Sequence, residues 1–113
     1  MKVYLSGPIS GISDHVGNFS RAADEVQGKG HEPLDPHDIP VFPHKGDCPD
    51  GARNGDDDPH TWPCYLRADL VYMLQCDALL MLQGHESSRG AIFERQVAEG
   101  CGMPVYLSIE ELS

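Results

Sequence analysis

Long apolar runs are missing from this sequence of 113 residues. No stretch approaches the roughly 20 apolar residues that a helix needs to cross a bilayer. The opening residues MKVYLSGP hold only a short apolar stretch before Ser6 and Gly7, which is too little for the core of a signal peptide. We therefore expect a chain without a removable leader that acts in the cytoplasm.

Basic residues are also few, since 8 Lys and Arg stand against 18 Asp and Glu and give a formal net charge of −10. Binding to DNA, RNA or an acidic membrane surface depends on clustered Lys and Arg. The charge balance therefore excludes a nucleic-acid polymer or a membrane as the main partner. It leaves a mononucleotide open, because backbone N–H groups at a helix N-terminus can hold one phosphate.

The four cysteines do not indicate a disulfide framework. Without an export signal we expect them to be reduced. Cys76 and Cys101 stand beside apolar runs, so we expect both to be small core residues. Cys48 and Cys64 belong to a different part of the chain, described below.

Apolar periodicity predicts strands that alternate with helices in a single domain over residues 1–113. Gly7 and Pro8 end the first strand, Gly28 and Gly30 end the first helix, and Pro33 favours an edge position for the second strand. The expected strands are 2–6, 31–34, 78–82 and 104–107, the expected helices are 18–28, 65–76 and 88–101, and residues 35–63 are expected to form a long loop rich in Pro, Gly, Asp and His.

Buried strands separated by helices are typical of a parallel sheet covered on both faces. We therefore expect a small three-layer α/β/α sandwich. Ligands of such domains bind beyond the carboxyl ends of the strands. Three segments reach that edge, namely the turn after the first strand, the loop after the second, and QGHESSRG at 83–90.

Glu94 raises the main functional question. Wound at about 100° per residue, the last helix places Ala91, Phe93, Val97, Ala98 and Cys101 on one apolar arc, and Glu94 falls inside that arc. A buried carboxylate is costly unless it has partners or a shifted pKa. Glu94 is thus a candidate catalytic residue, with a structural salt bridge as the alternative.

Asp69 borders the apolar side of the preceding helix in the same way. Two carboxylates on the core-facing sides of adjacent helices can share a cavity, where one is ionised and the other holds a proton. The alternative interpretation of Asp69 is a salt bridge or a helix cap.

Two short motifs supply the candidate binding residues. GPISG at 7–11 can form a tight turn in which Gly7, Pro8 and Ile9 approach a ligand, or it is an ordinary strand-to-helix turn. In SSRG at 87–90, Ser88 can cap the helix while Arg89, Gly90 and the free N–H groups bind a phosphate or carboxylate. Capping alone is the simpler alternative.

The 35–63 loop contains two H-x3-C pairs. Zinc accepts two Cys and two His ligands, so His44, Cys48, His60 and Cys64 are candidate zinc ligands, although this spacing is not that of a standard zinc finger. A Cys48–Cys64 disulfide and an unliganded loop are the alternatives, and we favour the unliganded loop. Trp62 can stack on a base or anchor the loop on the core.

Several motifs in order resemble the nucleoside 2-deoxyribosyltransferase-like proteins, in particular a small and mostly uncharacterised branch in bacteria and phages. The motifs are VYLSGPISG, YLRADL before CDALLML, and SSRGAIFE followed by GMPVY, and they span nearly all of the chain except residues 36–63. The resemblance implies a flavodoxin-like or Rossmann-like fold that assembles as a homodimer or higher homo-oligomer.

The resemblance also implies residue roles. The attacking glutamate of the family matches Glu94, the aspartate that helps the base leave matches Asp69, and the tyrosine that orients the nucleophile matches Tyr4. The turn glycine and the serine that meet the sugar or its 5′-phosphate match Gly7 and Ser88.

The residues and the resemblance together predict cleavage of an N-glycosidic bond without a cofactor. We expect hydrolysis of a nucleoside 5′-monophosphate, because Ser88, Arg89 and the helix end form an anion site that a free nucleoside would not use; transfer to a second base is the other outcome. A non-catalytic nucleotide sensor is the rival function, and a purely structural role leaves Glu94 unexplained.

Overall fold

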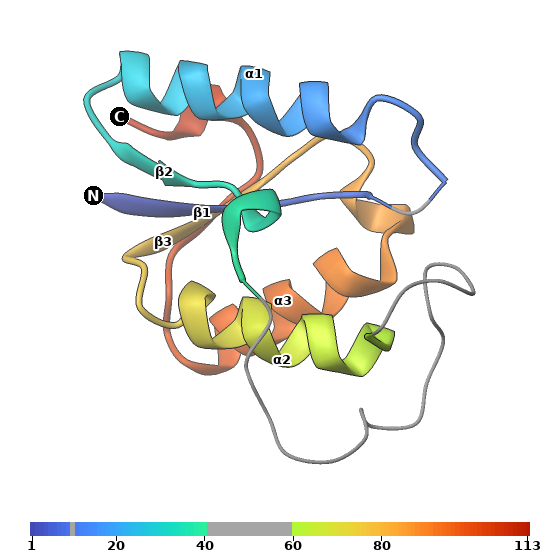
Figure 1. The fold of residues 1–113 in the computed structure, drawn as a ribbon. Helices are drawn as coiled ribbons and strands as arrows, with labels where there is room; N and C mark the ends of the chain where they lie inside the picture. The colour runs from blue at the N-terminus through green and yellow to red at the C-terminus, as the bar shows by residue number, and fades with distance from the viewer. Residues whose placement is uncertain (10, 41–59) are drawn as a thin grey trace.

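The computed structural model of the protein describes residues 1–9, 11–40 and 60–113. Its centre is a four-stranded parallel sheet with the strand order β2-β1-β3-β4 (Figure 1). The strands are β1 (Lys2–Ser6), β2 (Glu32–Leu34), β3 (Ala78–Met81) and β4 (Val105–Tyr106). The small parallel α/β sheet predicted from the sequence is confirmed, with β2 and its Pro33 at one edge.

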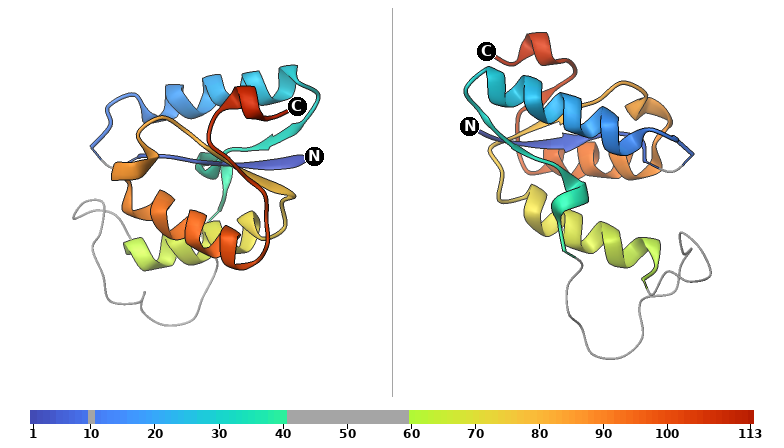
Figure 2. Two further views of the ribbon diagram at one scale, coloured as in Figure 1. Left: turned by 180° about the vertical axis from the view of Figure 1, so that it is seen from behind. Right: turned by 45° about the horizontal axis from the view of Figure 1, so that its top comes forward.

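Helices cover both faces of this sheet. One face carries α1 (His15–Gly28), and the opposite face carries α2 (Trp62–Met73) and α3 (Arg89–Gly100), as Figures 1 and 2 show. Short 3₁₀ turns complete the order as η1 (Pro36–Asp38), η2 (His85–Ser87) and η3 (Ile109–Glu111). None of the helices within the described ranges has the length and apolarity needed to span a membrane.

The alternation of side chains along β1 divides the core into two clusters. Val3 and Leu5 pack toward α1 and contact the cluster that contains Phe19. Tyr4 points to the other face and joins the cluster beneath α2 and α3. Because alternate residues of a strand face opposite sides, the side chain of residue 6 also points toward α2 and α3.

The direction of the strand order reverses between β1 and β3. The chain therefore leads from β1 to α1 on one face of the sheet and from β3 to α3 on the opposite face. Gly7, directly after β1, lies so close to the residue after β3 that a Cβ atom here would stand 2.8 Å from the Cβ of Leu82. Gly84 adopts φ +87°, which few residues other than glycine accept, and packs against Pro8. These close approaches hold the two turns together at the carboxyl edge of the sheet.

The bounds of α1 and α2 differ most from the sequence prediction, while β2, β3, β4 and α3 differ from it by one residue at one or both ends. Helix α1 begins at His15 rather than Asn18, and α2 spans Trp62–Met73 rather than 65–76. The expected structureless loop at 35–63 contains η1 at one end and the first turn of α2 at the other. The local sequence explains both ends, because the Asp35 carboxylate caps η1 by accepting the N–H of His37, and Pro63 suits the first turn of α2.

Two side chains predicted for the buried arc of α3 are exposed. Phe93 is 41% exposed, and Cys101 follows the end of the helix at Gly100 and faces solvent. The helix packs through a narrow stripe of Ala91, Glu94 and Ala98, so residues to either side remain accessible. The prediction that Cys76 and Cys101 are both core residues is therefore confirmed for Cys76, which is buried, and wrong for Cys101.

Candidate functional site

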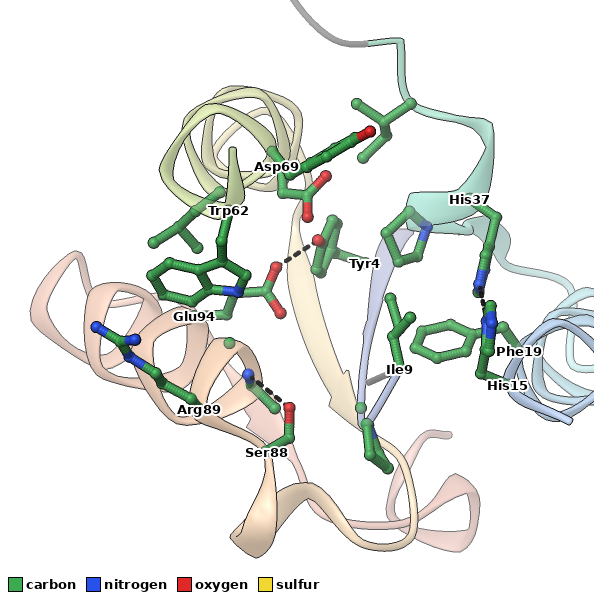
Figure 3. A pocket seen from close by; sticks show the side chains of 18 of the residues that line it. Tyr4, Ile9, His15, Phe19, His37, Trp62, Asp69, Ser88, Arg89 and Glu94 are labelled. Carbon is green, nitrogen blue, oxygen red and sulfur yellow. Dashed lines mark hydrogen bonds between the residues drawn. The ribbon is translucent and has the colours of Figure 1, made fainter. Parts of the chain in front are cut away.

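A buried carboxylate lies where α3 meets the sheet. Glu94 is 6% exposed, and both of its oxygens accept hydrogen bonds from β1. The Tyr4 hydroxyl donates to Oε2 at 2.5 Å, and the Ser6 hydroxyl donates to Oε1 at 2.7 Å. Figure 3 shows the Tyr4 contact.

The local sequence explains this convergence. Tyr4 and Ser6 are two residues apart on one strand and therefore point to the same face. Glu94 follows Ala91 by three residues and precedes Ala98 by four, so the three side chains form one helical stripe toward that face. The sequence analysis missed Ser6, although strand alternation offered a signal for it.

Asp69 projects from α2 toward the same place (Figure 3). The Asp69 side chain forms no hydrogen bond or ion pair with another described residue, and the residue lies in the middle of α2 rather than at its end. The helix-cap interpretation is therefore wrong, and the described residues supply no salt bridge for it. Burial, reinforced by the charge of Glu94, raises the pKa of Asp69 to about 8.

Opposing effects set the ionisation of Glu94. Burial raises its pKa to about 7, while the hydrogen bonds from Tyr4 and Ser6 favour the charged form and limit the rise. Burial and the neighbouring carboxylates also raise the pKa of Tyr4 well above its ordinary value, so its hydroxyl stays protonated as a donor. Near neutral pH the site can therefore hold an ionised Glu94 beside a protonated Asp69.

These groups open into a cavity of about 560 Å³. This volume falls within the range of roughly 300–1,000 Å³ common for small-molecule sites. All nine residues predicted from the sequence line it: Tyr4, Gly7, Pro8, Ile9, Asp69, Ser88, Arg89, Gly90 and Glu94. Their grouping at the carboxyl ends of β1 and β3 is established, while their catalytic and binding roles stay predictions.

The start of α3 forms one end of the cavity. Ser88 is the N-cap, and its hydroxyl oxygen accepts the N–H of Ala91 at 3.2 Å. Arg89 is exposed, and its guanidinium lies 4.4 Å from the centre of the Trp62 ring. Trp62 also lines the cavity and lies 6.0 Å from Phe93, ring centre to ring centre.

A second set of polar side chains lies on the other side of the cavity, and the sequence analysis missed it. His37, in η1, binds Asp35 and also lies 2.7 Å from His15 at the start of α1. Phe19 packs edge-on against His37 with 4.9 Å between ring centres. Because these residues come from separate elements, no spacing in the sequence signals their contact.

The predicted zinc set is only partly described. His44 and Cys48 lie outside the described residues, so neither the zinc site nor the Cys48–Cys64 disulfide is tested. Cys64 Sγ lies 3.6 Å from His60 Nδ1. Within residues 1–9, 11–40 and 60–113 no group of three or more His, Cys, Asp or Glu side chains is arranged to hold a metal ion.

Fold and site together define a small α/β domain with a pair of carboxyl groups in a cavity beyond the carboxyl ends of its parallel strands. Residues 1–107 match the model of the family described as "Domain of unknown function (DUF4406)", and the chain belongs to that family. No curated protein matches the chain. Since the family description assigns no activity, the deoxyribosyltransferase resemblance stays a prediction.

Proposed function

We propose that this protein is an N-glycosidase that cleaves the base–sugar bond of a nucleoside 5′-monophosphate with Glu94 as the nucleophile. The observation that carries the proposal is the buried Glu94 carboxylate, oriented by Tyr4 and Ser6 and facing a cavity beside Asp69. A carboxylate kept from water at a substantial cost in free energy needs a purpose. No described cation accounts for it as a structural ion pair.

In the first step, one Glu94 oxygen attacks C1′ of the sugar as the C1′–N bond to the base breaks. Asp69 gives its proton to the departing base, and the sugar is held as an ester of Glu94. The raised pKa of Asp69, about 8, suits it as the acid in this step. The lower value for Glu94, about 7, lets the nucleophile ionise first.

In the second step, water attacks C1′ while the Asp69 carboxylate accepts its proton. The ester bond to Glu94 breaks, the sugar phosphate leaves with a C1 hydroxyl, and both carboxyl groups return to their starting states. A second base in place of water would give transfer. We favour hydrolysis of a nucleoside 5′-monophosphate, because the start of α3 offers a binding site for a phosphate.

The start of α3 supports a phosphate at one end of the cavity. The first N–H groups of a helix have no partner within the helix and carry partial positive charge. Ser88 and Gly90 border the cavity at this point, with the Arg89 cation beside them at the rim. A free nucleoside would leave these groups unused.

The test is to incubate the protein with a panel of ribo- and 2′-deoxyribonucleoside monophosphates and to measure released base by chromatography. We expect release by the parent protein and none by Glu94→Ala. Glu99→Ala is the matched control, because Glu99 lies on the same helix but in solvent, paired with Arg95. Release that survives Glu94→Ala contradicts the assignment of the nucleophile. Thermal stabilisation by a nucleotide without any free base supports the sensor instead.

A further inference from the structure

A chain of hydrogen bonds runs along the cavity wall from β2 to α1. Asp35 Oδ1 accepts from the backbone N–H of His37 at 2.9 Å and lies 2.7 Å from its ring Nδ1. His37 Nε2 then lies 2.7 Å from His15 Nδ1, with the two rings only 12° from parallel. Both rings line the cavity that holds Glu94 (Figure 3).

The chain fixes where the protons lie when both imidazoles are neutral. An ionised carboxylate only accepts, so His37 carries its proton on Nδ1 and leaves Nε2 as an acceptor. His15 must then donate from its own Nδ1. Its Nε2 is left as a hydrogen-bond acceptor, for which the described residues provide no partner.

The positions proposed for the sugar and the phosphate leave the end of the cavity beside His15 and His37 for the base. If C1′ lies at Glu94 and the phosphate at Ser88, the base extends toward the wall formed by the two histidines. Figure 3 shows His37 and His15 on the opposite side of the cavity from Arg89, with Tyr4 between. Phe19, packed on His37, gives the same wall an apolar surface suited to a ring.

We propose that His15 Nε2 accepts a hydrogen bond from an exocyclic amino group of the base, with His37 and Asp35 as the residues that position it. The substrate class is then the nucleotides of adenine, cytosine or guanine. This inference rests on the proposed function for the orientation of the nucleotide. If the base carried a carbonyl oxygen at the same place, that oxygen would face the lone pair of His15 Nε2, and the nucleotide would bind less tightly.

Binding measurements separate this inference from catalysis. In the Glu94→Gln background, which we expect not to cleave, calorimetric titration compares adenosine monophosphate with purine riboside monophosphate, which lacks the amino group. The same titration compares deoxycytidine monophosphate, which has an amino group, with deoxyuridine monophosphate, which has a carbonyl oxygen instead. We expect the amino-bearing member of a bound pair to bind about three- to tenfold more tightly, the range for one neutral hydrogen bond.

Adding His15→Phe should reduce that ratio to near one, whereas the control His31→Phe should keep it. His31 lies at the opposite end of the sheet, between the N-terminus and Ser113. Nitrogen-15 NMR supplies an independent readout, and we expect both His15 and His37 in the Nδ1–H form at a pH where imidazole is neutral. Asp35→Asn should weaken this preference at His37.

The possible results distinguish failure of this inference from failure of the proposed function. Equal binding within each pair, binding of uridine or thymidine nucleotides alone, or an Nε2–H form at His37 overturns the inference and leaves base release by Glu94 untouched. A preference that depends on His15 supports it even if the parent protein releases no base. Failure to bind any nucleotide overturns both proposals.

Discussion

At the scale of single residues, the site depends on how burial and hydrogen bonding compete at Glu94. Removing the carboxylate from water favours its protonated form, while two hydroxyl donors favour the charged form. Burial is the larger effect, so the pKa of Glu94 stays near neutrality. The site can therefore gain or lose its nucleophilic charge within the physiological pH range.

The reaction should follow a bell-shaped pH profile, with an acidic limb from ionisation of Glu94 and a basic limb from loss of the Asp69 proton. The two limbs belong to the coupled pair and should lie near pH 7 and pH 8. Tyr4→Phe removes a hydrogen bond to a charged group, worth about 1.5–3 kcal/mol. We expect it to move the acidic limb upward by about one unit or more in kcat/KM profiles.

Tyr106→Phe is the control for that variant, because it removes a hydroxyl from β4 rather than from the strand that contacts Glu94. Its profile should match that of the parent. An unchanged acidic limb in Tyr4→Phe would show that the hydroxyl does not stabilise the charged nucleophile.

The sequence predicts some of these residues better than others. Helical winding alone places Glu94 among apolar neighbours and Asp69 beside them, because both positions depend on local periodicity. His15 and His37 were missed, since their contact depends on how α1 and η1 pack. Their partner Asp35 was missed for a different reason, because a two-residue capping bond inside a presumed loop gives only a weak local signal.

At the scale of elements, the site depends on the close approach of the turns after β1 and β3. The Cβ atom absent from Gly7 would overlap Leu82, so only glycine lets the two turns meet without displacement. The sequence predicted all four strands and three helices, but α1 and α2 both begin three residues earlier than the apolar periodicity indicates, because their first turns carry little of the apolar repeat.

Gly7→Ala should destabilise the protein by about 1–3 kcal/mol, the usual cost of an overpacked contact. Gly28→Ala is the matched control, since a Cβ there meets nothing within 4 Å and Gly28 ends α1 without a positive φ. That variant should be as stable as the parent or more stable by about 0.4–1 kcal/mol. Urea denaturation gives both values. Equal stability of Gly7→Ala and the parent would contradict the proposed close packing.

At the scale of the whole molecule, an acidic protein with a net charge of −10 contains two carboxyl groups with raised pKa values. The ion pairs of Arg21 with Asp14 and of Arg95 with Glu99 lie at the surface and involve neither group. The charge on the site is therefore controlled by pH, and folding stability must depend on pH through the same groups.

Folded Glu94 keeps its proton up to about pH 7, whereas the unfolded chain loses it near the ordinary value of 4.5. The folded state therefore binds more protons between these values, so the contribution of Glu94 to stability should fall as pH rises from about 4.5 to 7. The contribution of Glu94 is on the order of 3 kcal/mol. Glu94→Gln should show a flatter dependence and an equal or higher melting temperature at pH 8, with no base release.

Glu99→Gln tests whether this effect is specific to the buried position, because Glu99 is exposed on the same helix. Its melting temperatures should follow those of the parent at every pH. A large fall in the melting temperature of Glu94→Gln at pH 8 would indicate that the charge has a structural role.

The most direct test of the account is mass spectrometry of the protein after rapid acid quenching during turnover of a nucleoside monophosphate that it cleaves. We predict a covalent sugar-phosphate adduct on the peptide that contains Glu94, absent from Glu94→Gln. Base release without an adduct at Glu94, or with an adduct on another residue, would contradict the assignment of Glu94 as the nucleophile.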